Sequence, residues 1–264
     1  MKHALFFDID GTLVSYQTGR IPPSALEALR ILHERGHRLF LCTGRPPGTI
    51  ELLGDDLKTF PWDGIIAANG QVCMDKTRRI IRTAYIPTED LMAIVPWLEE
   101  HQIPANFYEL DFTYSNLPNP LLQEESKRTG KPRRELKVLD ARRSYTHSTI
   151  QVCPYMDESM DAEFLALAPG IQCARWTNVF ADMIPNDGGK QEGIKAMLEH
   201  IGFPQESCIT FGDGGNDIQM LKYAPIGVAM GNAPDHVKAA ADLVTDHVDQ
   251  DGLVNAFRTL GLLD

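Results

Sequence analysis

Eight residues of the sequence could do chemistry together, because each follows an expected strand or opens an expected helix. They are Asp8, Asp10, Thr43, Gly44, Lys190, Asp213, Asn216 and Asp217. In an open α/β sheet, ligands bind at the edge formed by the carboxyl ends of the strands. We therefore expect these residues to meet at one edge of a sheet.

The chemistry of this set is that of a phosphate site with a metal ion. Several carboxylates at one edge would repel one another unless a cation neutralised them, and hard oxygen ligands without nearby His or Cys suit Mg²⁺. A lysine and a hydroxyl beside such a cation suit a phosphoryl group, whose transfer needs charge compensation more than covalent chemistry. Glycines beside these residues, such as Gly44, let the backbone come close to an anion.

The elements that would position these residues alternate between strand and helix. Strands are expected at residues 4–7, 38–42, 64–67, 208–211, 226–230 and 243–244. Helices are expected from Ser24 to Gly36 and at residues 192–200, 218–223, 237–241 and 253–262. Ser24 and Glu27 have the spacing of a capping box at the start of the first helix. The alternation predicts an α/β fold with a doubly wound, Rossmann-like, mostly parallel sheet.

The middle of the chain has a different pattern. Helices are expected near residues 91–101 and 161–167, with strand-like stretches at 106–110, 149–152 and 171–176. We therefore predict an α+β cap, residues 84–183, inserted into a core made of residues 1–83 and 184–264.

Composition limits the possible partners. The 264 residues carry 25 Lys and Arg against 36 Asp and Glu, a net charge of −11, which argues against a nucleic-acid partner. Against this background, residues 126–143 hold a block of eight basic and two acidic side chains. This block is either an ordinary solvated surface or a patch that attracts an anionic substrate.

Cysteines and the first residues indicate where the protein works. Five cysteines without CxxC spacing predict neither a disulfide framework nor a structural zinc site, and Cys42 and Cys208 are expected to be buried thiols. The apolar run at residues 4–7 is too short for a signal peptide or a membrane span. We therefore expect a cytoplasmic protein without a membrane partner; the sequence does not indicate its oligomeric state.

Four motifs in order resemble those of the haloacid dehalogenase-like phosphatase superfamily. They are Asp8-Ile9-Asp10-Gly11-Thr12-Leu13, Thr43-Gly44-Arg45, Lys190, and Gly212-Asp213-Gly214-Gly215-Asn216-Asp217. The insert between the second and third motifs, together with Asn69-Gly70, Pro185, Asp251-Gly252 and the segment 228–233, resembles the Cof-like subfamily. The chain departs from the family at Gly189 and Gln191 around the lysine, and at Gln71, where Ala is commoner.

The resemblance implies a role for each candidate residue. Asp8 would be the nucleophile that forms an aspartyl-phosphate, and Asp10 the general acid and base. Mg²⁺ would be held by Asp8, by the backbone carbonyl of Asp10 and by Asp213. The phosphoryl group would be bound by Thr43, Gly44, Lys190 and Asn216. Asp217 would orient Lys190 or cap the following helix, and Arg45 could form a structural ion pair.

The resulting hypothesis is a Mg²⁺-dependent phosphatase that acts on a small phosphorylated metabolite, such as a sugar phosphate or a phosphorylated cofactor. The cap would set the choice of substrate. Two alternatives stay open: a phosphomutase with the same core, and a non-enzymatic sensor of a phosphate ligand. The sensor is disfavoured because a binder gains nothing from paired Asp8 and Asp10.

Overall fold

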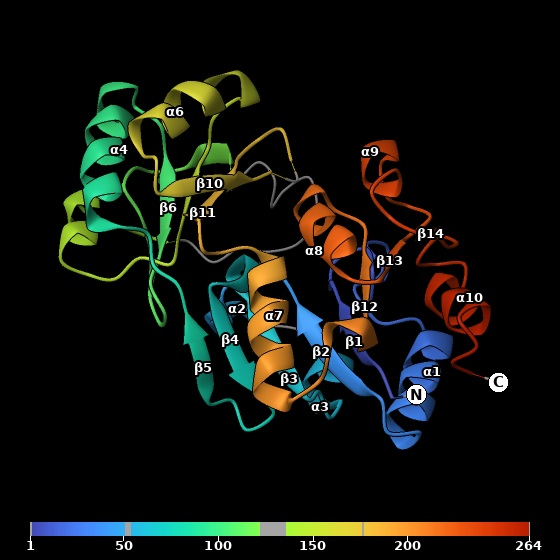
Figure 1. Cartoon of the computed structure of the whole chain (residues 1–264). Coiled ribbons are helices and arrows are strands. Elements are labelled where there is room, and N and C mark those ends of the chain that lie inside the picture. Colours follow the sequence, from blue (N-terminus) through green and yellow to red (C-terminus); the bar gives the residue numbers. More distant parts are fainter. Residues whose placement is uncertain (1, 51–53, 122–135, 176, 264) are drawn as a thin grey trace. The chain divides into compact units, whose positions relative to one another are not determined.

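The chain folds into two compact units. A computed structural model describes residues 2–50, 54–121, 136–175 and 177–263 (Figure 1). The first unit consists of Met1–Thr83 and Gly188–Asp264, and the second of Ala84–Asp187. The chain returns to the first unit at residue 188 rather than at 184, because Asp182–Pro185 forms a strand that pairs within the sheet of the second unit.

The first unit contains an eight-stranded sheet in the order β14-β13-β12-β1-β2-β3-β4-β5. The strands are β1 (Ala4–Phe7), β2 (Arg38–Cys42), β3 (Gly64–Ala67), β4 (Val72–Asp75), β5 (Ile80–Thr83), β12 (Cys208–Gly212), β13 (Ile226–Ala229) and β14 (Leu243–Val244). The six strands from β14 to β3 are parallel, and β4 and β5 add an antiparallel edge. The predicted mostly parallel sheet is confirmed, while the β4–β5 hairpin was not predicted.

Helices pack against both faces of this sheet. The helices described in this unit are α1 (Pro23–Glu34), α2 (Pro47–Ile50), α3 (Asp55–Thr59), α7 (Lys190–Ile201), α8 (Ile218–Tyr223), α9 (Asp235–Lys238) and α10 (Gly252–Thr259). Successive side chains of a strand point to opposite faces. In β1, Phe6 packs in a cluster with Ile194 of α7, whereas Phe7 meets the ring of Phe257 in α10 edge to face. The doubly wound architecture follows from these two packed faces.

The predicted capping box at Ser24 is wrong. The helix α1 begins at Pro23, its N-cap is Pro22, and no side chain caps it. The Ser24 hydroxyl instead donates to the carboxylate of Asp251, while Glu27 pairs with Arg30 on the exposed side of the helix. Proline at the first helical position explains the start, since its fixed φ suits a helix and its missing N–H needs no cap.

Strand β1 is the point at which the chain reverses direction across the sheet. The chain passes from β1 to β2 and β3 on one side, and after the insert it continues through β12, β13 and β14 on the other side. Ligands of doubly wound sheets bind at such switch points, beyond the carboxyl ends of the strands. The segments that follow β1, β2 and β12 are therefore the place to look for a site.

The second unit is an α+β domain with its own core. Its six-stranded sheet has the order β10-β11-β9-β6-β7-β8. The strands are β6 (Ala105–Tyr108), β7 (Thr113–Ser115), β8 (Lys137–Val138), β9 (Gln151–Pro154), β10 (Ile171–Ala174) and β11 (Asp182–Pro185), and the helices include α4 (Thr88–Glu100) and α6 (Asp161–Leu167). Phe107, Val152 and Met183 of the sheet share one apolar cluster with Trp97 of α4 and Phe164 of α6. Short 3₁₀ helices complete the chain at Ala68–Gly70, Ala141–Tyr145, Glu158–Met160, Gln205–Ser207 and Gly215–Asp217.

The basic block of residues 126–143 is only partly described, because residues 126–135 lie outside the described ranges. Within the described part, Arg142 forms a two-pronged ion pair with Glu99, at 2.6 and 2.7 Å. Arg143 pairs in the same way with Glu109 and lies over the ring of Phe112. These two arginines therefore stabilise the second unit itself.

All five cysteines are free, and Cys42 and Cys208 are buried thiols as predicted. Among the residues that the structure describes, no helix is long and apolar enough to cross a membrane.

Candidate active site

Three buried carboxylates meet at the carboxyl edge of the first sheet. Asp8 directly follows β1, and Asp213 directly follows the neighbouring strand β12. One carboxylate oxygen from each of Asp8, Asp213 and Asp217 lies within 4.8 Å of the others. The parallel pairing of β1 and β12 produces this convergence, because it brings both strand ends to the same edge.

Lys190 supplies the positive charge among these carboxylates. It is the first residue of α7, and its side chain is fully buried. Its Nζ donates to Asp8 Oδ1 at 2.6 Å and to Asp217 Oδ1 at 2.5 Å. Lys190 therefore bridges the residue after β1 and the loop after β12.

The second oxygen of Asp217 fixes the loop that follows β12. Asp217 Oδ2 accepts hydrogen bonds from the backbone N–H groups of Asp213 and Gly214, at 2.9 and 2.8 Å. This contact caps the 3₁₀ helix Gly215–Asp217. Asp217 thus contacts Lys190 as expected. The alternative that it caps the following helix is wrong, because no side chain caps α8 (Ile218–Tyr223), and Asp217 instead caps the 3₁₀ helix in which it stands.

Asp213 is held by two neutral donors. Thr12 Oγ1 donates to Asp213 Oδ1 and Asn232 Nδ2 to Asp213 Oδ2, both at 3.0 Å. Asn232 Nδ2 also donates to the backbone carbonyl of Gly11. The loops after β1, β12 and β13 are therefore joined around one carboxylate.

Burial and charge place this cluster under electrostatic strain. Burial raises the pKa of Asp8 and of Asp213, and the neighbouring carboxylates add to the rise, although Lys190 opposes it. Burial would lower the pKa of Lys190, but Asp217 and Asp8 outweigh it and raise that pKa above its ordinary value. The lysine is therefore cationic, and its single charge does not balance three carboxylates.

The donor set fits a hard divalent cation. The converging side-chain ligands are carboxylate oxygens, and the strained cluster would be relieved by a further positive charge. Oxygen-only donors of this kind are typical for Mg²⁺. Asp217 is the least available of the three, because its two oxygens accept three hydrogen bonds, one from the Lys190 ammonium and two from backbone N–H groups.

Asp10 is engaged differently from the other acidic residues. Its carboxylate accepts two hydrogen bonds from Arg45, from Nε at 2.6 Å and from the guanidinium NH₂ at 2.7 Å. Its backbone carbonyl, the expected metal ligand, accepts a hydrogen bond from the hydroxyl of Tyr16 at 2.9 Å. Arg45 does form the ion pair considered from the sequence, and its partner is Asp10.

Gly44 and Asn216 lie in contact although they follow different strands, and Thr43 directly precedes Gly44. Thr43 is buried after β2, and its Oγ1 accepts a hydrogen bond from the backbone N–H of Arg45. A Cβ placed on Gly44 would lie 3.4 Å from Asn216 Nδ2, so the two residues are in close contact. The structure therefore brings the loops after β2 and β12 together.

Sequence reasoning missed several residues that complete this edge. Tyr16 contacts Asp10, and burial together with the carboxylates of Asp213 and Asp8 raises its pKa. Thr12 and Asn232 hold Asp213, and Asn69 accepts a hydrogen bond from Asn216. Thr12, Asn69 and Asn232 lie inside motifs that the sequence did display, but only the folded chain shows what their side chains contact.

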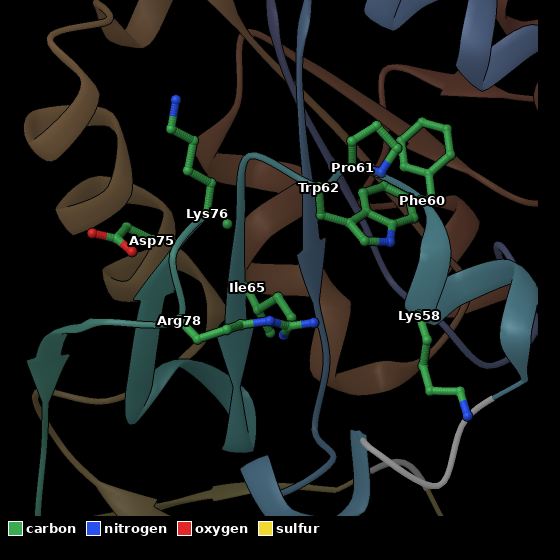
Figure 2. A pocket seen from close by; sticks show the side chains of 9 residues that line it. Lys58, Phe60, Pro61, Trp62, Ile65, Asp75, Lys76 and Arg78 are labelled. Atoms are coloured by element: carbon green, nitrogen blue, oxygen red, sulfur yellow. The ribbon is translucent and has the colours of Figure 1, made fainter.

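A pocket of about 190 Å³ lies elsewhere in the first unit (Figure 2). It is lined by Lys58, Phe60, Pro61, Trp62, Gly64, Ile65, Asp75, Lys76 and Arg78. Gly64 begins β3, so the pocket is at the opposite edge of the sheet from Asp8. The Asp75 carboxylate accepts hydrogen bonds from Thr77 and Arg79. Lys76 and Arg78 are exposed, so these lining residues do not form a cluster of buried polar groups.

The chain is similar to known proteins over nearly its whole length. A family model described as haloacid dehalogenase-like hydrolase matches residues 5–257. A Bacillus subtilis (strain 168) protein named "Putative phosphatase YkrA" is 31% identical over 262 residues, which cover 98% of each chain. The solved structure of the HAD subclass IIB sugar phosphatase BT4131 is similar with a TM-score of 0.89 and 36% identity, covering 99% of this chain and 100% of that one. The phosphatase BT1666 from Bacteroides thetaiotaomicron has a TM-score of 0.90 and 31% identity, covering 99% and 96%.

Proposed function

The chain belongs to the haloacid dehalogenase-like hydrolases and is a phosphatase that acts on phosphorylated small molecules, and we propose that it is Mg²⁺-dependent and works through an aspartyl-phosphate. The observation that carries this proposal is the cluster of Asp8, Asp213 and Asp217 around the buried Lys190. Such a cluster combines a carboxylate nucleophile, metal ligands and a fixed cation for a phosphoryl group.

Asp8 is the proposed nucleophile. One of its carboxylate oxygens bonds to phosphorus while the bond from phosphorus to the ester oxygen breaks, which leaves a phosphorylated Asp8. Lys190 holds Asp8 Oδ1 at 2.6 Å and so fixes the orientation of the carboxylate. A water molecule then attacks phosphorus, which releases inorganic phosphate and restores Asp8.

Asp10 is the proposed proton carrier. It gives a proton to the leaving oxygen in the first step and takes one from the attacking water in the second. Both oxygens of Asp10 accept hydrogen bonds from Arg45. One of them has to be released before Asp10 can donate a proton, so the proposal requires Arg45 to move or to exchange partners during turnover.

The remaining roles concern charge. Asp8, Asp213 and the backbone carbonyl of Asp10 would hold Mg²⁺, which when bound compensates negative charge on the phosphoryl oxygens. Lys190 and Asn216 would donate to these oxygens together with Thr43, and Gly44 would let the backbone come close to them. Asp217 would keep Lys190 protonated and in place through their contact at 2.5 Å.

We propose a sugar phosphate or a phosphorylated cofactor as the substrate, and residues 84–187 as the part that selects it. Similarity to a named sugar phosphatase supports the first choice. The second unit has its own sheet and apolar core, and it carries a buried polar network in which Gln151 and Cys153 both donate to Asp182. A turnover screen across phosphorylated sugars, nucleotides and cofactors would identify the class.

The test of the reaction is an assay with p-nitrophenyl phosphate that measures released phosphate. EDTA should abolish turnover and Mg²⁺ should restore it. Asp8→Asn should lower kcat by more than about 10³-fold, because the nucleophile is lost. Asp55→Asn, at an exposed carboxylate paired with Lys58, should leave the rate unchanged.

Two results would contradict the proposal: turnover that persists in EDTA, or an Asp8→Asn protein with full activity. With a sugar phosphate as substrate, an isomerised sugar phosphate in place of free phosphate would identify a phosphomutase instead. Tight binding of phosphate esters without turnover would identify a sensor.

A further inference from the structure

The turn between β3 and β4 has an unusual backbone. Three consecutive residues have positive φ angles: Ala68 at 48°, Asn69 at 54° and Gly70 at 97°. For residues other than glycine this left-handed region costs about 1–2 kcal/mol each. Such strain persists only where the surrounding structure fixes the conformation, and it is frequent at functional sites.

Hydrogen bonds to the segment after β2 fix this turn. The backbone N–H of Ala68 donates to the carbonyl of Arg45, and that of Asn69 donates to the carbonyl of Thr43, both at 2.9 Å. A Cβ on Gly70 would collide with the carbonyl of Gly189, just before Lys190. The turn therefore lies tightly between the Thr43 segment and the start of α7.

The side chain of Asn69 connects the turn to a third segment. Asn216 Nδ2, in the loop after β12, donates to Asn69 Oδ1 at 3.0 Å. Asn69 itself is 1% exposed. A Cβ on Gly44 would lie 3.0 Å from this same oxygen, so Asn69, Gly44 and Asn216 are packed against one another.

The hydrogen bond between Asn216 and Asn69 fixes the orientation of the Asn216 side-chain amide. An asparagine side chain has an NH₂ group with two donors and an oxygen that only accepts. Because Asn69 presents its oxygen, Asn216 must turn its NH₂ toward it. The second N–H of the same nitrogen is then set in direction as well, and it can serve an anion.

We propose that Asn69 is a positioning residue for phosphate binding: its carboxamide orients the Asn216 amide, while its backbone N–H fixes the carbonyl of Thr43. The role in phosphate binding rests on the proposed function, but the orientation of Asn216 does not. Asparagine suits both tasks, because it tolerates the left-handed conformation better than most residues and carries an acceptor.

A double-mutant cycle tests the proposal on the full-length protein. The variants are Asn69→Gly, Asn216→Ala and the two combined, since glycine keeps the left-handed backbone and removes only the carboxamide. Inhibition by orthophosphate and the KM for p-nitrophenyl phosphate are measured with Mg²⁺. Asn69→Gly should weaken inhibition by orthophosphate and raise the KM for p-nitrophenyl phosphate, each by about fivefold, which is the effect of one hydrogen bond. The change in kcat should be smaller. In the Asn216→Ala background it should cause no further loss.

A matched control separates positioning from a general effect of glycine. Arg78→Gly makes the same change at a left-handed residue, with φ of 66°, at the opposite edge of the sheet, and should leave orthophosphate inhibition unchanged. Equal losses from Asn69→Gly with and without Asn216, or no loss at all, would overturn the proposal.

A crystal structure of Asn69→Gly keeps this inference distinguishable from the proposed function. A wild-type protein without phosphatase activity would refute the proposed function alone. An Asn216 side chain that keeps its orientation in the variant would refute the positioning role, whatever the activity.

Discussion

At the scale of single residues, the site concentrates more negative charge than its lysine can balance. Asp8 and Asp213 are each 7% exposed, and Asp217 is fully buried. Removing carboxylates from water favours their neutral form unless opposite charges or hydrogen bonds compensate. Lys190 contacts Asp8 and Asp217, whereas Asp213 is held only by the neutral donors Thr12 and Asn232 among the contacts described. Asp213 is therefore the carboxylate that depends most on a metal ion.

The first prediction concerns pH and metal. Burial raises the pKa of Asp213 to about 8 and that of Asp8 to about 7, from 3.8. Between pH 4 and 8 the metal-free folded protein thus binds more protons than the unfolded chain, so its stability should fall as pH rises. The expected fall is up to about 1 kcal/mol per pH unit for each carboxyl. Urea unfolding in EDTA at pH 5, 6.5 and 8 would measure it.

Mg²⁺ should oppose this loss, because a cation binds the ionised carboxylates. The stabilisation by Mg²⁺ should therefore be larger at pH 8 than at pH 5. Asp213→Asn should remove part of the pH dependence and most of the Mg²⁺ effect. Equal stability of the metal-free protein at pH 5 and pH 8 would contradict the pKa argument.

The sequence predicted the site residues that directly follow the end of a strand. It did not predict the contacts that form only when separate loops fold together. Asp8, Asp213 and Lys190 meet as expected, because parallel strands bring their ends to one edge. For Arg45 the sequence suggested an ion pair without identifying a partner, and the structure shows that the partner is Asp10. The contact of Tyr16 with Asp10 had no sequence signal, since it depends on how the turn after β1 folds back.

At the scale of elements, the position of Lys190 depends on how closely α7 packs against the sheet. Gly193 lies one turn after Lys190 and faces β3 and β4. A Cβ at Gly193 would lie 2.5 Å from Ile66 Cγ2, 3.1 Å from Gly70 Cα and 3.3 Å from Cys73 Sγ. The missing side chain lets the first turn of α7 approach the strand ends.

The second prediction is that Gly193→Ala destabilises the protein and impairs phosphate binding. The added methyl group must push α7 outward, and overpacking of this kind costs about 1–3 kcal/mol. Because the shift occurs in the first turn, Lys190 should move away from Asp8, so KM for p-nitrophenyl phosphate should rise. Urea unfolding and steady-state kinetics would show both effects.

Gly48→Ala is the matched control for this variant. Gly48 lies in α2, and a Cβ there would meet nothing within 4 Å. Its stability should change by less than about 1 kcal/mol, in the stabilising direction, because alanine favours the helix. A Gly193→Ala protein as stable and active as Gly48→Ala would show that α7 is not held by this close approach.

Element types followed from the sequence wherever apolar periodicity was strong. The strands β1, β2, β3 and β12 and the helices α7 and α8 lie where they were expected, within a few residues. The β4–β5 hairpin escaped prediction because Val72–Asp75 and Ile80–Thr83 are short and include charged residues. The start of α1 was misplaced because Ser24 has the right residue type for a cap but binds Asp251 instead.

At the scale of the whole molecule, the two units have separate apolar cores. The cluster around Phe107, Trp97 and Phe164 draws all of its members from residues 86–183, within the second unit. The cluster around Phe6, Phe40 and Ile194 belongs to the first unit. Separate cores predict that each unit can lose stability on its own, since core packing contributes most of the folding free energy.

Phe164→Ala tests this independence. The ring of Phe164 is fully buried in α6 and meets Trp97 edge to face, with centroids 5.3 Å apart. Its removal should lower the stability of the second unit by about 3–5 kcal/mol. Hydrogen exchange followed by mass spectrometry should then show lost protection in residues 84–187, with protection unchanged in β1, β12 and α7. Mg²⁺ should still stabilise the first unit, because Asp8 and Asp213 are intact.

A uniform loss of protection across both units would instead mean that they unfold as one cooperative structure. In that case, substitutions in residues 84–187 that change substrate selection would also affect the catalytic unit.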